Sequence, residues 1–151
     1  MPFLVLLLAT LLAPVPNPAS AVLHAWDVDR SAAWAAGDPA ALARLYTPRS
    51  PAGAADVAML RAWQARGLRV VDLRMQLLAV ETRRRTPDRL VVVVSDRLAS
   101  GVAVGGGVRQ PLPRDAVSTR RLVLVRVAGE WRVAQASPVR TTSPTVRSRN
   151  R

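Results

Sequence analysis

The apolar residues of this chain change their spacing at Gly67, and that change limits the folds open to it. Before Gly67 the sequence predicts three helices, over residues 22–36, 39–45 and 54–66. Gly37 and Gly67 are typical helix stops, and Asp38 followed by Pro39 is typical of a helix start. After Gly67 apolar and polar residues alternate, which predicts strands. Helices followed by strands indicate the α+β class.

The second half of the chain predicts an antiparallel meander. Its expected strands span residues 71–79, 89–99, 101–110, 117–127 and 131–136. The run of four valines, Val91–Val94, indicates a strand buried on both faces. Residues 105–107 are all Gly and predict a turn, because a phosphate-binding loop would continue into Lys and Ser or Thr. We therefore expect three N-terminal helices packed on a curved, mainly antiparallel sheet.

The N-terminal residues are typical of an export signal. Phe3–Ala13 is an almost unbroken apolar run, and Ala19-Ser20-Ala21 has the small-x-small pattern of a cleavage site. The run is shorter than the ~20 apolar residues that span a bilayer, and no Lys or Arg precedes it. We expect residues 1–21 to be a signal peptide or a short anchor, with a buried helix as a third alternative. Residues 22–137 then form one exported domain, and residues 138–151 form a disordered basic tail.

The charge of the chain is carried by one residue type. All 22 basic residues are Arg, and the net charge is +12. This favours either solvated surface arginines, set by genome composition, or attraction to an anionic envelope component; we expect no nucleic-acid partner. The absence of Cys excludes disulfides and thiolate chemistry. The one His, His24, leaves no second imidazole for zinc, and we expect neither metal nor cofactor.

Two stretches resemble the nuclear transport factor 2-like (SnoaL-like, cystatin-like) superfamily. Ala36-Gly37-Asp38-Pro39 and residues 41–48 are similar to that family's junction between the first two helices, and residues 129–133 are similar to its last hairpin. The resemblance covers about residues 22–136 and implies a cone of helices on a curved sheet. Family members include ketosteroid isomerases, polyketide cyclases, dehydratases and non-enzymatic binding modules, so it leaves the function open. The one Tyr, Tyr46, lies after the second predicted helix, where it does not match the family's enzymes.

Asp96 is the acid most suited to chemistry. It shares a strand face with the bulkier apolar residues of its strand, and burial there raises the pKa of a carboxyl unless a cation pairs with it. Two interpretations stay open. Asp96 is either the acid of a ligand pocket or half of an ion pair with Arg121 or Arg97.

The first helix carries a second candidate. Trp26, Arg30 and Trp34 are spaced four apart and share one helix face. They form either a cation–π ligand platform or core packing with Arg reaching for solvent. We assign no catalytic residue. The predicted ligand pocket contains Trp26, Arg30, Trp63, Asp96 and Arg121.

These features favour a non-catalytic exported binding module of the cell envelope, with an envelope protein or an anionic envelope component as its partner. The alternative is a SnoaL-like protein of the cyclase, isomerase or dehydratase type that binds a small apolar ligand in the cone. The four-valine strand also offers apolar surface for a homodimer.

Overall fold

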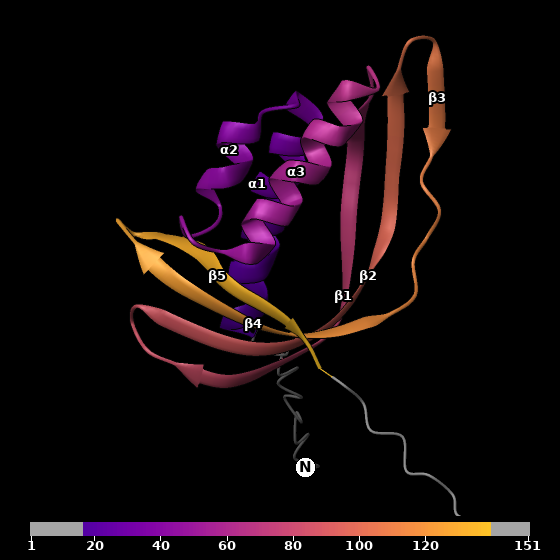
Figure 1. The fold of residues 1–151 in the computed structure, drawn as a ribbon. Coiled ribbons are helices and arrows are strands. Elements are labelled where there is room, and N and C mark those ends of the chain that lie inside the picture. Colours follow the sequence, from indigo (N-terminus) through magenta and orange to yellow (C-terminus); the bar gives the residue numbers. More distant parts are fainter. Residues whose placement is uncertain (1–16, 140–151) are drawn as a thin grey trace, which may run out of the picture.

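The computed structural model describes residues 17–139 as three helices followed by five strands (Figure 1). The helices are α1 (Pro18–Ala36), α2 (Pro39–Arg44) and α3 (Pro51–Ala65). The strands are β1 (Arg69–Arg85), β2 (Arg89–Gly105), β3 (Val108–Pro111), β4 (Ser118–Val127) and β5 (Glu130–Pro138). The predicted α+β order is confirmed.

Each helix begins at a proline that follows a polar cap. The side chains of Asn17, Asp38 and Ser50 accept backbone N–H groups of the first turns of α1, α2 and α3. Proline suits this first position because its missing N–H would have no partner there. The sequence prediction started the first and third helices three to four residues late, because it treated these prolines as breakers.

The early start of α1 brings the predicted cleavage region into the fold. Ala19 lies in the first turn of α1 and is fully buried in the core. The apolar run Phe3–Ala13 lies outside the described residues, as does residue 140 onward of the predicted tail. Among residues 17–139, no helix is both long and apolar enough to cross a membrane.

The sheet is antiparallel and has the strand order β1-β2-β4-β5, with the short β3 paired to the end of β2. β1 and β2 are longer than predicted. β1 continues to Arg85, although its last residues are charged and exposed, because they pair in register with residues 90–94 of β2. β2 continues through the predicted break after residue 99 as far as Gly105.

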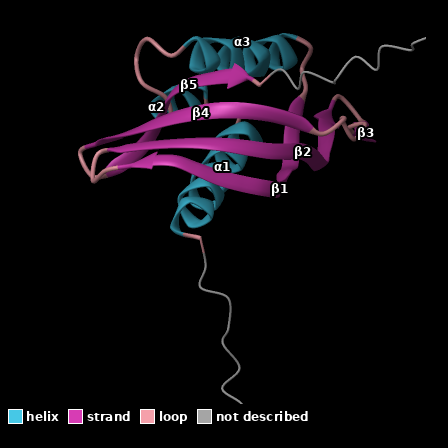
Figure 2. Ribbon diagram, turned by 90° about the horizontal axis from the view of Figure 1, so that it is seen from below, coloured by secondary structure: helices cyan, strands magenta, loops and turns pink. Residues whose placement is uncertain are grey.

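All three helices pack on one face of the curved sheet (Figure 2). Register shifts in β1 accompany this curvature, since bulges bend a strand and increase its twist. The core between the layers contains apolar residues from all three helices and from β1, β2, β4 and β5, among them Leu23, Trp34, Leu42, Leu60, Val70, Leu90, Val92, Val94, Leu124 and Val133. The opposite, outer face of the sheet has no helix on it within residues 17–139.

Candidate functional site

A buried carboxylate joins the three helical segments. Asp56 of α3 accepts two hydrogen bonds from the Arg30 guanidinium of α1, Nε to Oδ2 and Nη2 to Oδ1, each at 2.7 Å. The Tyr46 hydroxyl donates to Oδ2 at 2.7 Å and the Trp34 indole donates to Oδ1 at 3.3 Å. Every donor therefore comes from a segment other than α3, and the carboxylate attaches α1 and the segment that follows α2 to α3.

The environment fixes the protonation states of Tyr46 and Arg30. Burial raises the pKa of the Tyr46 hydroxyl, and the nearby Asp56 charge raises it further. Burial opposes the charge on Arg30, but its hydrogen bonds to Asp56 outweigh that effect and raise its pKa. Tyr46 thus stays a neutral donor and Arg30 a cation near neutral pH. A carboxylate with four donors has little capacity left for a substrate, so the cluster acts as structure.

Trp26, one turn before Arg30 on α1, also contacts the segment that follows α2. Its indole donates to the Leu45 carbonyl at 2.9 Å, and its ring meets the Tyr46 ring edge-on with centroids 5.4 Å apart. Backbone bonds between Leu45, Thr47 and Val133 then attach this segment to β5 as a short parallel bridge. The predicted stripe on α1 is therefore a packing device, with Arg30 paired inside rather than reaching for solvent.

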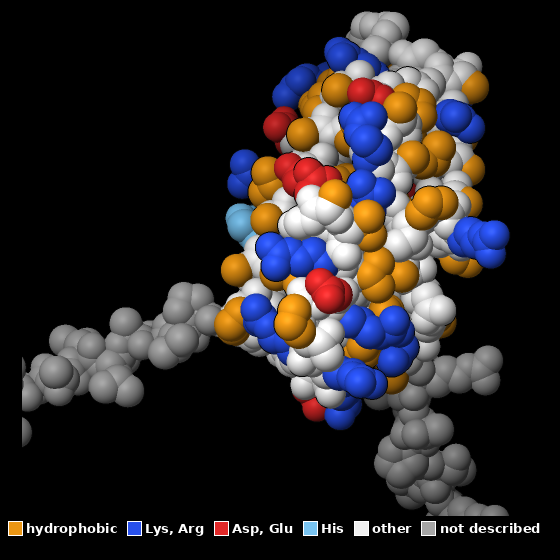
Figure 3. All heavy atoms as spheres, turned by 90° about the vertical axis from the view of Figure 1, so that its left-hand side faces the viewer, with side chains coloured by type: hydrophobic (Ala, Val, Ile, Leu, Met, Phe, Trp, Pro, Cys, Tyr) orange, Lys and Arg blue, Asp and Glu red, His pale blue; other side chains and the backbone are white. Residues whose placement is uncertain are grey.

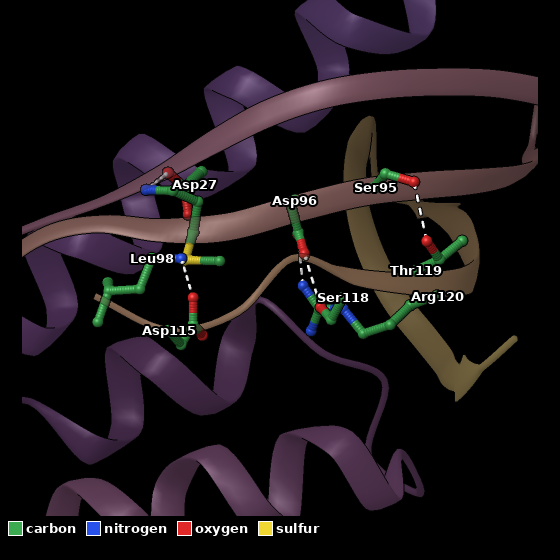
Figure 4. A network of polar contacts seen from close by, with 9 residues as sticks. Asp27, Ser95, Asp96, Leu98, Asp115, Ser118, Thr119 and Arg120 are labelled. Carbon is green, nitrogen blue, oxygen red and sulfur yellow. Dashed lines mark hydrogen bonds and ion pairs between the residues drawn. The ribbon is translucent and has the colours of Figure 1, made fainter. Parts of the chain in front are cut away.

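The second buried carboxylate lies on the inner face of the sheet (Figure 4). Asp96 is 4% exposed. It accepts from the Arg120 guanidinium at 2.5 Å and from the Ser118 hydroxyl at 3.1 Å. The predicted Asp–Arg ion pair exists, but its cation is neither Arg121 nor Arg97.

Strand register explains why Arg120 is the partner of Asp96. Asp96 lies opposite Ser118, and Arg120, two residues further along β4, shares that face. Arg121 lies opposite Val93 and is exposed on the outer face. Arg97 also faces outward, where it donates to Gln76 at 2.9 Å. Parity along one strand predicted the face of Asp96, but the partner depended on the pairing of β2 with β4.

Asp27 lies near this cluster on the inner side of α1 (Figure 4). Burial raises the pKa of its carboxyl, and the negative charge of Asp96 adds to that rise. The Met75 backbone N–H, which donates to it at 3.3 Å, and the Arg30 cation act in the opposite direction without reversing it. The folded protein therefore binds a proton at Asp27 more tightly than the unfolded chain does. Stability from this residue falls as pH rises from the ordinary carboxyl pKa of about 3.9 to the folded value.

A groove lies elsewhere, between α1, α2 and the hairpin of β4 and β5. It has a volume of about 750 Å³. Its floor on α1 is a row of small side chains, Ala21, Ala25, Ala32, Ala33 and Ala36. Trp26 and Trp131 form part of its walls, and Asp29, Asp38, Glu130 and Arg44 supply its charges. Neither Asp27 nor Asp96 lines it.

The five residues predicted to share a pocket are thus distributed over the molecule. Trp26 lines the groove, and Arg30 and Asp96 are held in separate buried pairs. Trp63 is half-buried on α3, with the Arg66 guanidinium 5.0 Å from its ring centroid, and Arg121 is on the outer sheet face. His24 is exposed on α1. Among residues 17–139, no group of three His, Cys, Asp or Glu side chains could hold a metal ion.

Sequence reasoning missed the role of Asp56. It assigned Asp56 to the first turn of its helix as a partner of the helix dipole, but α3 begins earlier, at Pro51, and its first turn has no acid. The available signal was an unpaired Arg30 between two tryptophans on one helix face. Such a cation needs a buried acid on a neighbouring element, and α3 carries Asp56 alone.

Comparison with known proteins identifies the fold. No protein-family model matches the sequence, and no curated protein matches it. The intermembrane space region of the chloroplast protein ARC6 has a TM-score of 0.56 at 13% identity, covering 82% of this chain and 95% of that one. Aln2 from a Streptomyces species has 0.53 at 15%, covering 84% and 93%. ActVI-ORFA from Streptomyces coelicolor has 0.51 at 17%, covering 80% and 95%.

At these identities the likeness shows the fold alone. The chain shares the α+β fold of these proteins, with helices packed on a curved antiparallel sheet, which is the architecture that the resemblance of its helix junction and last hairpin implied.

Proposed function

We propose that this protein is a non-catalytic binding module of the cell envelope, which holds an apolar segment of a partner protein in the groove between α1, α2 and the β4–β5 hairpin. The observation that carries the proposal is the position of that groove. Its lining includes neither Asp56 nor Asp96, and both of these carboxylates are already held by arginines.

The lining of the groove describes the partner. The alanine side chains of α1 leave its backbone accessible at close range, which suits a second helix or an extended apolar segment. Asp29, Asp38 and Glu130 outnumber Arg44 around this floor, although the whole chain is strongly basic. Charge complementarity therefore favours a segment that carries Lys or Arg beside its apolar residues.

Photocrosslinking in the native host tests the proposal. A photoreactive amino acid at Ala32, exposed in the groove, is compared with one at Ala62, exposed on α3 outside it. We expect one partner to crosslink at Ala32 through an apolar, basic segment and none at Ala62. Filling the groove with Ala25→Trp should abolish the adduct, whereas the matched Ala62→Trp should not. Equal adducts at both positions, or adducts that survive Ala25→Trp, would refute the proposed groove.

The envelope location has its own test. Intact-mass measurement of the protein from each host fraction should find a chain that begins at Val22 outside the cytoplasm, or the uncleaved chain in the membrane fraction. A full-length chain recovered from the cytosol alone would contradict export.

A second candidate function has one specific observation behind it. Asp27 and Asp96 lie near each other between α1 and the sheet, and the pKa of the Asp27 carboxyl is raised. An acid whose pKa is raised by burial beside a second carboxylate is suited to proton transfer, which would serve a protein that acts on a small cyclic ligand. Native mass spectrometry of the protein from its host should then show an added small mass that Asp27→Asn loses. A bare chain from every preparation would count against it.

A further inference from the structure

The outer face of the sheet contains two valines that no helix covers within residues 17–139. Val91 of β2 and Val123 of β4 are register partners, and they are only 4% and 1% exposed. Neither belongs to the core beneath the helices, which takes Leu90 and Val92 from β2. Because successive strand residues point to opposite faces, Val91 and Val123 point outward. Other side chains of the sheet must shield them.

Four arginines occupy the register positions around this valine pair. Arg84 of β1 lies opposite Val91, and Arg89 precedes Val91 by two residues on β2. Arg121 is two residues before Val123 on β4, and Arg132 of β5 lies opposite Val125 on the same face. The apolar stems of arginine cover hydrophobic surface while the guanidinium groups stay in water. Arg84, Arg89 and Arg121 are exposed in this way, whereas Arg132 is half-buried and its Nε is enclosed. We call these four residues, Arg84, Arg89, Arg121 and Arg132, the arginine face.

None of the four arginines forms an ion pair within residues 17–139, although Glu81 and Glu130 occupy register positions at the edges of the same face. The ion pairs formed within residues 17–139 are Arg30–Asp56, Arg83–Glu81 and Arg120–Asp96, and none of them involves these four residues. Glu81 shares the face but is bound to Arg83 at 2.9 Å. Basic side chains also gather around the lower part of the molecule where the hairpins end (Figure 3).

We propose that the arginine face docks onto the surface of a bilayer that contains anionic phospholipids, with its guanidinium groups against the headgroup phosphates. Arginine suits this task because its planar fork donates two hydrogen bonds to one phosphate. No aromatic residue of the described chain lies at an outer-face register position of β2 or β4, which removes the stacking platform of single-stranded nucleic-acid sites. Two copies of the chain are also disfavoured here, since their positive charges would face each other.

This docking goes beyond the proposed groove function and does not depend on it. The groove lies on the helical side of the sheet and the arginine face on the other. A chain held on a membrane by its sheet would therefore present the groove away from the lipid.

Vesicle cosedimentation of the full chain tests the proposal. Binding is measured to phosphatidylcholine vesicles with and without phosphatidylglycerol, and the ratio of the two affinities is compared among variants. The N-terminal run is the same in every variant, so its contribution cancels when the ratios of two variants are compared. Arg84→Gln/Arg121→Gln is compared with Arg61→Gln/Arg114→Gln, which removes two exposed arginines from α3 and the loop before β4.

Each arginine near an anionic surface contributes about 1 kcal/mol, or about fivefold in affinity. We expect the face variant to lower the anionic-to-neutral ratio about 25-fold and the control variant to change it much less. Arg84→Lys/Arg121→Lys keeps the charge and should retain most of the ratio, which separates a charge effect from misfolding.

Three outcomes would overturn the proposal. Equal losses in the face and control variants would assign binding to net charge, and no loss in either would assign it to another segment. A face variant that loses affinity for duplex DNA but not for anionic vesicles would make the ligand a nucleic acid.

Discussion

The Asp56 cluster predicts a large and specific loss of stability. Asp56→Asn removes the charge opposite Arg30, whose side chain is only 19% exposed. Breaking a buried ion pair by removing one partner costs about 3–5 kcal/mol, because the remaining charge is left without compensation. The Asn carbonyl oxygen still accepts from some of the four donors, so we expect about 3 kcal/mol. That is a large share of the ~5–15 kcal/mol that stabilises an ordinary domain.

Companion variants separate the charge from the packing. Tyr46→Phe removes one donor to a charged acceptor and should cost about 1.5–3 kcal/mol. Replacing the polar cluster with apolar side chains, in Arg30→Met/Tyr46→Phe/Asp56→Leu, should recover most of the loss, since no buried charge then remains. Trp34 keeps its longer 3.3 Å donor without a partner in this variant, so recovery should be incomplete.

Urea unfolding followed by tryptophan fluorescence measures these free energies. Trp26 and Trp34 report on α1 directly. If the dependence of the unfolding free energy on urea concentration is the same in every variant, only the stability differs. A cost below about 1 kcal/mol for Asp56→Asn would show that the cluster is solvated and contributes little. A triple variant no more stable than Asp56→Asn would show that specific hydrogen bonds, rather than the uncompensated charge, set the loss.

Three further outcomes are expected from single substitutions, each measured by urea unfolding. Gly53→Ala should destabilise the protein, although alanine favours helices, because the new Cβ would lie 2.6 Å from Tyr46 Cβ and Cγ. Gly67→Ala meets no atom within 4 Å but has a φ of +71°, so it should cost about 1 kcal/mol. A smaller loss for Gly53→Ala than for Gly67→Ala would contradict the close packing at Gly53. Asp27→Asn should be more stable than the natural chain at about pH 7, and the two should converge below about pH 3.9; a difference independent of pH would show that Asp27 is not desolvated. Asp96→Asn should cost about 1–3 kcal/mol and the exposed Asp88→Asn under about 0.5 kcal/mol, whereas equal effects would mean that Arg120 does not hold Asp96.

The sequence predicted the elements of this fold better than their ends. Gly37, Asp38 and Gly67 determine local backbone conformations by themselves, and the structure has its helix boundaries at these residues. β1 was underestimated because its last residues, Arg83–Arg85, have no apolar alternation. They become a strand only because β2 supplies hydrogen-bond partners.

The candidate site was less predictable because it depends on contacts between elements. The face of Asp96 followed from strand alternation, and an ion pair with an arginine was one of its two interpretations. The choice of Arg120 over Arg121 required the register of β2 against β4, which a single strand does not encode. The Arg30–Asp56 pair joins residues 26 positions apart on two helices. Nothing local to either helix specifies which of their faces meet.

The distribution of charge over the surface is determined only when the chain folds. Composition gives a net charge of +12 but does not say where on the surface that charge lies. The fold places the carboxylates of Asp56 and Asp96 inside, each against an arginine, so neither neutralises the surface. Register then brings Arg84, Arg121 and their neighbours onto the one sheet face without helices. The folded chain therefore has an uneven charge distribution, with arginines on the outer sheet face and a groove with more acidic than basic residues on its helical side. That asymmetry, rather than the net charge, is what an oriented contact with an anionic surface requires.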